Sequence, residues 1–410
     1  MTTPNCRACG TDLEHTLVDL GLSPLANSYV PLDHKSDTDP AYPLHARVCG
    51  KCFLVQVDDV VPPSDIFSHY AYFSSYSSSW VEHARKYCAS ATERLGLNDK
   101  SFVVEVASND GYLLQHFVAN SVPVLGVEPA ANVAAEAEKK GVRSLVAFFG
   151  KETAETVVAE HGHADLTAAN NVLAHVPDIN DFVSAFAAIL KDDGVSTFEF
   201  PHLLNLLEKT QFDTIYHEHF SYLSLYAVEK CFAANGLKVF DVEELPTHGG
   251  SLRVWAQKAV GTRPETDRLI ALRAKETDAG IATLACYEGF ETKVQAIRDS
   301  LLAFLKKAKL DGKTVAGYGA AAKGNTLLNY CGVGTDLIDF VVDANPHKQN
   351  TLLPGSRIPV HAPDMLKERK PDYVLILPWN LQNEIMESVG YVRNWGGQFL
   401  VAVPEVTVLR

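Results

Sequence analysis

The sequence predicts an α/β protein in three parts, and three observations lead to this prediction. Two Cys-x-x-Cys pairs lie near the N-terminus, a strand, a glycine-bearing turn and a helix follow from residue 101, and a second such unit begins at residue 314. A chain of 410 residues, 47% of them hydrophobic, is long enough to build two or three domains with their own cores. We expect the parts to span residues 1–70, 71–260 and 261–410.

The overall charge and the hydropathy pattern argue against some classes of partner. A net charge of −14 disfavours nucleic acid, because binding phosphate requires a basic surface. An anionic substrate would have to be met by a local cluster of cations. No apolar run is long enough to span a bilayer, and the first residues do not resemble a signal peptide. We therefore expect a cytoplasmic protein without membrane contact and, since the pattern leaves no obvious apolar face exposed, a monomer.

The N-terminal cysteines form two pairs with the spacing of zinc ligands. Each pair turns two sulfurs toward one point, so the sequence predicts a closed, structural tetrathiolate site. Its ligands are Cys6, Cys9, Cys49 and Cys52. Two disulfides are the alternative, which the missing secretory signal disfavours, and a redox role for one pair would leave the other unexplained. We expect the metal to hold together a small domain that has few large apolar residues of its own.

The segment from Ser68 to Trp80 is rich in aromatic and hydroxyl side chains, Tyr70 among them. Such side chains suit a surface that holds sugars or nucleotides by stacking and hydrogen bonds. The same composition is equally compatible with a lid or linker that packs on the next domain. A helix is predicted directly afterwards, over residues 81–95.

The first strand–turn–helix unit carries acids where a phosphate-binding unit has bare glycines. Its turn contains the single glycine Gly111, and a second strand ends at Glu128 some twenty residues later. This pattern is typical of a doubly wound sheet, in which the acid after the second strand binds ribose hydroxyls. Glu105 and Asp110 would repel a pyrophosphate and attract a cation. The sulfonium and amino group of S-adenosylmethionine therefore fit where NAD does not.

Residues 211–222 concentrate two imidazoles, two carboxylates and two phenols within twelve residues. Such groups, held close together and partly buried, exchange protons near neutral pH. Burying so many polar groups is costly unless they are used. The alternative is a polar loop whose histidines cap neighbouring backbone groups, and we favour proton chemistry.

The last third of the chain predicts a long helix followed by a second α/β layer. Apolar residues recur at helical spacing from Phe290 to Phe304, so this helix should dock on a neighbouring domain. Strands are expected at residues 314–319, 337–343, 372–377 and 398–403. Gly317 and Gly319 with Asp343 resemble half of a dinucleotide fingerprint, whose third glycine comes late, at Gly324. The alternative is a glycine turn that is needed only for close packing.

Residues 105–201 resemble the class I S-adenosylmethionine-dependent methyltransferases. The resemblance lies in the turn from Glu105 to Gly111, the acid Glu128, the stretch 165–178 and the strand 194–201. This resemblance implies a central Rossmann-like domain whose last strands are residues 237–245 and 251–257. It also implies the cofactor-binding residues, which are Glu105, Asp110, Gly111, Glu128 and Asn171.

The chain resembles the nucleotide-sugar C-methyltransferases over essentially its whole length. The resemblance lies in the cysteine pairs, the segment 70–80 and the motifs at 212–219, 247–253 and 317–325. These three-part enzymes add a methyl branch to deoxysugars of antibiotics. The chain closely resembles the C-3-methyltransferases that act on dTDP-linked 3-amino-4-keto-2,3,6-trideoxyhexoses. The resemblance implies an N-terminal zinc-binding module, a central domain that binds S-adenosylmethionine and a second Rossmann-like domain that binds the nucleotide sugar.

Making a carbon–carbon bond with S-adenosylmethionine requires a carbanion or enolate, a base to form it and a donor to its oxygen. The resemblance and this chemistry together assign His219 as the base, with Glu218 or its surroundings orienting the ring. Tyr216 is then the donor to the enolate oxygen. His175, at the end of the fourth strand, is a second polar contact and the alternative base.

The same resemblance implies that the sugar nucleotide lies mainly on the C-terminal domain, with the target carbon in the cleft between the domains. We interpret Lys323 and the start of its helix as holding the pyrophosphate. The expected substrate-binding residues are Tyr70, Lys323, Asn325 and Arg253. The segment 70–80 is expected to close the cleft.

Two other functions stay open from the sequence. A nicotinamide-dependent dehydrogenase would use the half that runs from Gly317 to Asp343 and would not need Glu128. A non-catalytic zinc-ribbon adaptor would bind a nucleoside ligand only for regulation. The acidic net charge and the crowded run at 216–219 argue against the adaptor.

Overall fold

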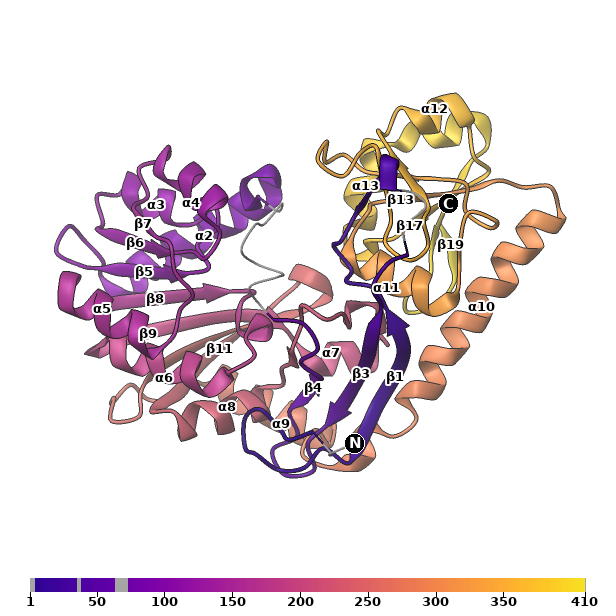
Figure 1. The fold of residues 1–410 in the computed structure, drawn as a ribbon. Coiled ribbons are helices and arrows are strands. Elements are labelled where there is room, and N and C mark those ends of the chain that lie inside the picture. Colours follow the sequence, from indigo (N-terminus) through magenta and orange to yellow (C-terminus); the bar gives the residue numbers. More distant parts are fainter. Residues whose placement is uncertain (1–3, 35–37, 63–72, 410) are drawn as a thin grey trace.

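The computed structural model describes residues 4–34, 38–62 and 73–409 and organises them around three sheets (Figure 1). A four-stranded sheet belongs to the N-terminal module, a seven-stranded sheet to the middle domain and an eight-stranded sheet to the C-terminal domain. In Figure 1 the two larger sheets stand side by side, and the N-terminal strands lie below and between them. The predicted α/β fold in three parts is confirmed.

The N-terminal module is an antiparallel sheet completed by a strand from far along the chain. Strands β1 (His15–Ser23), β3 (Tyr42–Val48) and β4 (Val55–Val57) pair in that order. The fourth strand is β10 (Ser221–Tyr222), which belongs to the run of titratable side chains and pairs antiparallel with β4. The zinc module therefore holds one end of this run.

The middle domain is a doubly wound sheet with an antiparallel hairpin at one edge. Its order is β11-β12-β9-β8-β5-β6-β7, in which β12 is antiparallel to both of its neighbours and the strands from β9 to β7 run parallel. The strands are β5 (Val103–Val106), β6 (Val124–Val127), β7 (Ser144–Leu145), β8 (Ala164–Asn170), β9 (Leu190–Pro201), β11 (Leu237–Leu245) and β12 (Ser251–Lys258). The strands expected between residues 101 and 257 are thus present.

Helices cover both faces of this sheet, as the crossovers between parallel strands require. The helices are α2 (Ser78–Leu95), α3 (Leu114–Ala119), α4 (Ala131–Glu138), α5 (Lys151–His161), α6 (Ile179–Ile189), α7 (Leu203–Glu208), α8 (Leu225–Ala234) and α9 (Asp267–Asp278). The predicted helix 81–95 begins three residues early at Ser78, because the Ser77 side chain caps it by accepting from the Trp80 amide.

The C-terminal domain is a mixed sheet that borrows one strand from the N-terminal module. Its order is β19-β18-β17-β13-β14-β16-β15-β2. The strands are β13 (Val315–Tyr318), β14 (Val341–Val342), β15 (Thr351–Leu352), β16 (Pro359–His361), β17 (Tyr373–Ile376), β18 (Gln398–Val401), β19 (Thr407–Leu409) and β2 (Val30–Pro31). The helices are α11 (Ala322–Cys331), α12 (Met365–Arg369) and α13 (Gln382–Ser388). The sequence predicted β13, β14, β17 and β18 but not β2, β15, β16 or β19.

Short 3-10 turns shape the loops at the site. They are η1 (Leu32–His34), η2 (Ser74–Tyr76), η3 (Leu173–His175), η4 (Phe212–Thr214), η5 (Thr247–Gly249), η6 (Leu284–Tyr287), η7 (Trp379–Leu381) and η8 (Gly390–Trp395).

Helix α10 (Phe290–Leu310) joins the N-terminal module to the C-terminal domain (Figure 1). Its predicted apolar stripe is buried at Val294, Ile297 and Leu301, in one core with strands β1, β3 and β4 and with β13. The N-terminal module thus shares a large hydrophobic core with the C-terminal domain. The expectation that this module has few large apolar residues of its own is wrong.

Candidate active site

The four predicted zinc ligands converge on one point. Their sulfur atoms all lie within 4.8 Å of one another, and all eight cysteines of the chain are free thiols, so the disulfide alternative is wrong. The amide nitrogen of Gln56 lies 3.2 Å from the Cys6 sulfur, and hydrogen bonds from Cys52 and then Gln56 lower the pKa of Cys6 to about 4. Four converging thiols fill a tetrahedral sphere, which fits a structural Zn²⁺ and leaves no open position for a substrate.

Glu128, the acid expected to bind the cofactor, follows β6 at the carboxyl edge of the middle sheet. Glu128 is buried, and its two carboxylate oxygens accept hydrogen bonds from the backbone amides of Asn109 and Ala130, both at 2.9 Å. Burial raises the pKa of Glu128, and these amides oppose the rise. Each oxygen keeps a second lone pair, so the fixed carboxylate can also accept hydroxyl donors.

The turn after β5 is held in an uncommon backbone conformation. Ala107 and Asn109 have φ of 55° and 50°, in the left-handed region that residues with a Cβ rarely adopt. Such strain gathers at functional sites, where the surroundings hold it in place. Gly111 also has a positive φ, of 75°, and a Cβ there would lie 3.1 Å from Ala137. Gly111 therefore serves the packing of α4 under the turn.

Several buried polar atoms at this edge have no hydrogen-bond partner among the described residues. They are Oε2 of Glu105, Oγ of Ser108, Oδ1 of Asp110, Oδ1 and Nδ2 of Asn170, and Oδ1 of Asn171. Burial, and then the neighbouring Glu128 and Asp110, raise the pKa of Glu105 well above its ordinary value. A ligand that brings donors and positive charge would satisfy these atoms. The ammonium, sulfonium and ribose hydroxyls of S-adenosylmethionine fit this donor set.

The Asp110 carboxylate already has a cationic partner within the chain. Its Oδ2 lies 3.2 Å from the Lys140 ammonium and accepts the Ser75 amide, also at 3.2 Å. The Ser74 amide donates to the Asn109 side chain at 2.9 Å. Asp110 therefore fixes η2 on the cofactor turn, and Lys140 compensates much of its charge.

The expected lid lies only partly within the described residues. Tyr70 is outside them, so its predicted contact with substrate stays a prediction. The described portion rests on the cofactor turn, and the rings of Phe73 and Tyr76 lie 6.4 and 6.5 Å from His347 of the C-terminal domain, centroid to centroid. This portion thus reaches across from one domain to the other.

The His219 ring is held in one tautomer by its two neighbours. Its Nδ1 lies 2.9 Å from the Thr214 carbonyl oxygen, which can only accept, so Nδ1 carries the proton. Its Nε2, 2.7 Å from the Tyr216 hydroxyl, is then the acceptor of that hydrogen bond. Burial first, and then His175 nearby, lower the pKa of His219 well below its ordinary value. The ring is a neutral base whose basic nitrogen faces a phenol.

His217 caps a neighbouring backbone group, as the alternative interpretation of this run expected. Its Nε2 lies 3.1 Å from the Pro43 carbonyl oxygen, and the ring packs edge-on against Tyr42. It caps the N-terminal module and takes no part in the group around His219. One histidine of the run is therefore structural and the other lies in the candidate centre.

Glu218 does not contact the ring nitrogens of His219. Both of its oxygens lie 2.8 Å from the amide nitrogen of Asn27, a residue of the N-terminal module. Burial raises the pKa of Glu218 to about 7, opposed by this hydrogen bond and by the charge of Lys348. The surroundings, Thr214 and Tyr216, orient His219. Sequence reasoning missed Asn27 and Lys348, since neither stands in a motif.

Two further imidazoles adjoin His219. The His175 ring, in η3 after β8, lies 4.6 Å from the His219 ring, centroid to centroid, and burial lowers the pKa of His175 to about 4. His248 has a φ of 53°, and its Nε2 lies 3.4 Å from the Asn171 amide nitrogen. Burial, and then the charge of Lys323, lower the pKa of His248 to about 4. Sequence reasoning did not single out His248, although it lies in the motif at 247–253.

Lys323 lies where the C-terminal domain meets the histidines around His219. Its ammonium donates to Oδ1 of Asn380 at 2.7 Å and sits 4.6 Å from the centre of the Trp379 ring. The Trp379 indole N–H donates to the Asp213 carboxylate at 2.7 Å, and burial raises the pKa of Asp213 to about 6. Lys323 is thus a half-buried cation next to Trp379 and Asn380, and its contact with phosphate stays a prediction.

Two expected substrate contacts are turned toward protein partners. Asn325 is buried and its amide nitrogen donates to the Ala26 carbonyl at 2.6 Å. The Arg253 guanidinium donates to Glu199 at 2.7 Å and to Glu243 at 3.1 Å. We therefore revise both assignments, because Asn325 joins two parts of the chain and Arg253 pairs with a buried and a half-buried acid of the middle sheet.

The partial dinucleotide fingerprint has a packing explanation. A Cβ on Gly317 would lie 2.7 Å from Val341, one on Gly319 2.5 Å from Pro378, and one on Gly324 2.8 Å from Leu377. The Asp343 carboxylate accepts the backbone amides of Ala320 and Asn345, both at 2.7 Å. All three glycines are thus required by close contacts within the domain.

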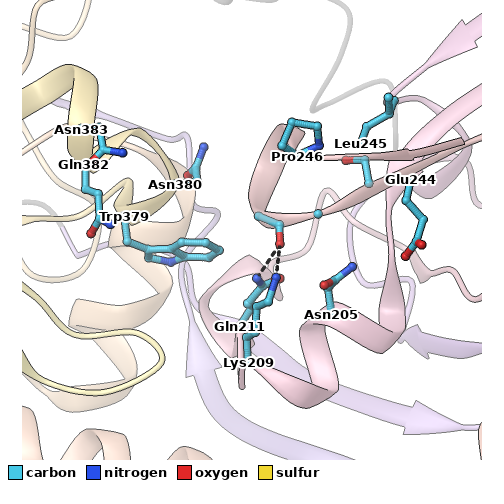
Figure 2. A pocket seen from close by; sticks show the side chains of 13 residues that line it. Asn205, Lys209, Gln211, Glu244, Leu245, Pro246, Trp379, Asn380, Gln382 and Asn383 are labelled. Carbon is cyan, nitrogen blue, oxygen red and sulfur yellow. Dashed lines mark hydrogen bonds between the residues drawn. The ribbon is translucent and has the colours of Figure 1, made fainter. Parts of the chain in front are cut away.

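A cleft of 610 Å³ lies between the β11–β12 hairpin and the start of α13 (Figure 2). One wall, from the middle domain, carries Asn205, Lys209, Gln211, Glu244, Leu245, Pro246, Gly249, Gly250 and Ser251. The other, from the C-terminal domain, carries Trp379, Asn380, Gln382 and Asn383. The walls face each other at the carboxyl edges of both sheets, where α/β folds bind ligands.

Comparisons with known proteins agree with this architecture. Family models match residues 6–67 ("Putative zinc binding domain"), 80–242 ("Methyltransferase domain") and 246–404 ("C-methyltransferase C-terminal domain"). C-methyltransferase NovU from Streptomyces niveus is 38% identical over 404 residues, which cover 98% of this chain and 96% of that protein. The chain belongs to the C-methyltransferase family.

Two of the solved structures that are similar to this C-methyltransferase each match 44% of it. A S-adenosylmethionine-dependent methyltransferase from Clostridium acetobutylicum has 13% identity and a TM-score of 0.36, covering 44% of this chain and 92% of that chain. Magnesium protoporphyrin IX methyltransferase from Synechocystis, with bound SAH, has 16% identity and a TM-score of 0.34, covering 44% and 82%.

The C-methyltransferase uses S-adenosylmethionine and has an N-terminal zinc-binding module, as the sequence predicted. Membership of the family decides against the dehydrogenase and the adaptor. Among the described residues, none of the helices is both long and apolar enough to cross a membrane.

Proposed function

We propose that this C-methyltransferase adds a methyl group to C-3 of a dTDP-linked 4-keto-deoxysugar, a 3-amino-2,3,6-trideoxyhexose, in antibiotic deoxysugar biosynthesis. The observation that carries the proposal is the neutral His219 with its basic Nε2 turned to the Tyr216 hydroxyl. A base beside a phenolic donor is what enolisation of a ketone requires. The sugar nucleotide comes from the motifs shared with nucleotide-sugar C-methyltransferases, and the 38% identity with NovU supports the C-methyl transfer.

His219 removes the proton from C-3, and the electron pair of that bond forms the enolate with the C-4 ketone. The resulting imidazolium keeps its Nδ1–H on the Thr214 carbonyl, which stabilises the charge. Tyr216, released from Nε2 when the substrate enters, donates its hydrogen bond to the enolate oxygen. S-adenosylmethionine, bound at the edge that carries Glu128, would supply the methyl group to C-3 and leave as S-adenosylhomocysteine. Alignment and exclusion of water supply much of the remaining rate gain.

His175 is the alternative base. Its ring lies edge-on to His219, and burial lowers the pKa of His175 as it lowers that of His219. Glu218, with a pKa of about 7, accepts a hydrogen bond from Asn27 and does not contact the His219 ring nitrogens. The proposed enzyme works as a cytoplasmic monomer.

The test is product formation from a panel of dTDP-4-keto-deoxysugars with methyl-labelled S-adenosylmethionine. We expect NMR of the isolated product to show the labelled methyl group on carbon, at C-3. A label on oxygen or nitrogen, or no transfer to any member of a panel that varies the C-3 substituent, would overturn the proposal. Exchange of the C-3 proton with deuterium in the absence of cofactor would show the enolisation step separately.

A further inference from the structure

Helix α11 carries two polar residues in succession on its buried side, where a helix that packs on a sheet usually carries apolar ones. Asn325 is 1% exposed and Thr326 is 2% exposed. Both are weak helix formers, and a threonine inside a helix often turns its hydroxyl to the carbonyl four residues earlier. Here both side chains donate instead to backbone carbonyls far along the chain. The pair therefore joins α11 to segments outside its own domain.

The partner of Thr326 lies inside the run that carries the candidate base. The Thr326 hydroxyl donates to the Ile215 carbonyl at 3.0 Å, and both residues are buried. Ile215 follows Thr214, whose carbonyl accepts the Nδ1 proton of His219. It precedes Tyr216, whose hydroxyl donates to Nε2 of the same ring. The bond from α11 thus fixes the backbone that carries both contacts of the base.

A second bond from the C-terminal domain fixes the other side of Thr214. The Trp379 indole N–H donates to the Asp213 carboxylate at 2.7 Å. Asp213 is buried and lies directly before Thr214 in the chain. Thr214 is therefore flanked on both sides by residues that the C-terminal domain holds, and its carbonyl sets the tautomer of the base.

Residues 216–219 form a tight turn that brings the ring back to this backbone. The His219 amide donates to the Tyr216 carbonyl at 2.9 Å, and the two rings lie 4.0 Å apart, centroid to centroid. With Nδ1 on Thr214 and Nε2 on the phenol, three hydrogen bonds join His219 to residues 214–216. A displacement of that backbone therefore displaces the base and the phenol together.

The helix that supplies the Thr326 hydroxyl is itself fixed in place. A Cβ on Gly324 would lie 2.8 Å from Leu377, so α11 packs closely on the strand β17 side of its sheet. A rigid element is what precise alignment requires, because a misplacement of about 1 Å lowers a rate by about 100-fold. The hydroxyl is thus presented to the run at a defined position.

We propose that Thr326 is a positioning residue of the reaction, which aligns His219 and Tyr216 with the acceptor through the Ile215 carbonyl. Thr326 acts through the backbone of the run and not by contact with either substrate. The C-terminal domain then has a part in proton removal as well as in binding. This inference rests on the proposed function, since it takes His219 as the base.

The test compares Thr326→Val, which keeps the shape of the side chain without its hydroxyl, with Thr326→Ser, which keeps the hydroxyl. Steady-state methyl transfer is measured on the full chain with a keto-sugar that the wild type methylates. We expect Thr326→Val to lower kcat by about 100-fold, as a base displaced by about 1 Å does. KM for both substrates should be nearly unchanged, and Thr326→Ser should restore kcat to near the wild-type value.

Thr167→Val is the matched control. It removes another buried threonine hydroxyl, which bonds to the Ser196 hydroxyl at 2.5 Å within the middle sheet. Both valine variants should lower Tm to a similar extent, and only Thr326→Val should lower kcat. Thr326→Ala removes the same hydroxyl with a smaller side chain, and it replaces Thr326→Val in the comparison if that variant does not fold.

Wild-type kcat in Thr326→Val overturns the assignment. Equal losses of kcat in the two valine variants, or a loss that Thr326→Ser does not restore, show a merely structural contact and overturn it as well. Failure of the proposed function shows differently, as absence of methylated product from every keto-sugar with the wild type.

The tautomer of His219 reports the contact without any substrate. Nitrogen NMR of protein labelled at histidine, with the signals of this ring identified by their loss in His219→Gln, should show the Nδ1–H tautomer in the wild type. Thr326→Val should show a mixture of both tautomers, because the Thr214 carbonyl is no longer held against Nδ1. An unchanged tautomer in Thr326→Val overturns the inference, whatever the enzyme methylates.

Discussion

Replacing Tyr216 by Phe separates two roles that the structure gives to one hydroxyl. The hydroxyl donates to Nε2 of His219 at 2.7 Å, and in the proposed reaction it donates to the enolate oxygen. Losing a single positioned oxyanion donor lowers kcat by about 100- to 1,000-fold, or about 3–4 kcal/mol of barrier. The fold should survive, because one neutral hydrogen bond contributes about 1 kcal/mol.

The pH profile of the same variant carries a second expectation. A protonated Nε2 cannot accept the Tyr216 hydrogen bond, so this bond stabilises the neutral ring and adds to the lowering of its pKa by burial. Without the hydroxyl, the pKa of His219 rises. The acid limb of kcat/KM, which reports the base of the free enzyme, should therefore move to higher pH.

The assay is steady-state methyl transfer between pH 5 and 9, with Tyr222→Phe as the matched control. Tyr222 is a phenol of the same run, whose hydroxyl accepts the Tyr216 backbone amide at 3.3 Å and lies outside the proton path. Affinity for S-adenosylmethionine, measured by calorimetry, reports intact folding. A Tyr216→Phe enzyme with wild-type kcat refutes the enolate donor, and an acid limb that moves to lower pH refutes the direction of the hydrogen bond.

Three further expectations follow from other contacts. His219→Gln should lower kcat by about 100- to 10,000-fold. His217→Gln should keep most of the activity and lose about 1 kcal/mol of folding stability, because His217 contacts Pro43 outside the group around His219. Equal losses of rate in the two variants would contradict the assignment of His219 as the base. Cys49→Ser should lower both Tm and kcat, because β4 next to the zinc site pairs with β10 of the catalytic run; a fully active variant without metal would contradict this link. The pKa of Glu218 rises from 4.5 to about 7 on folding, so between these pH values the folded state binds more protons than the unfolded state. The free energy of unfolding should therefore fall by about 3 kcal/mol as the pH rises from 4.5 to 7. Urea unfolding of Glu218→Gln should show a smaller dependence of this free energy on pH, and an unchanged dependence would refute the assignment.

Local patterns were sufficient to predict most of the architecture. The two cysteine pairs, the strands around Glu105 and Glu128, and the apolar stripe of α10 are each written within a few residues, since period and spacing are local properties. The strands β2, β15, β16 and β19 are only two or three residues long, so they carry no periodic signal. Their pairing depends on which sheet edge the chain reaches, and a pattern does not record that.

Residue roles divided along the same line. The sequence placed His217 and His219 in one run, but their different partners, the Pro43 carbonyl and the Tyr216 hydroxyl, come from separate parts of the chain. Arg253 carries the charge that an anionic substrate needs, yet buried Glu199 and half-buried Glu243 already pair with it. Residue type limits what a side chain is able to do, while burial and neighbours decide what it does.

The least predictable feature is the part that the N-terminal module plays in the centre. Asn27 holds Glu218 from 191 positions away, the Ala26 carbonyl holds Asn325 from 299 positions away, and the next residues join the C-terminal sheet as β2. The catalytic run is in turn paired to β4 through β10. All three parts of the chain therefore fix the position of His219. A change at Asn27 should accordingly act on catalysis and on the angle between the large domains together, which no motif within a single domain would predict.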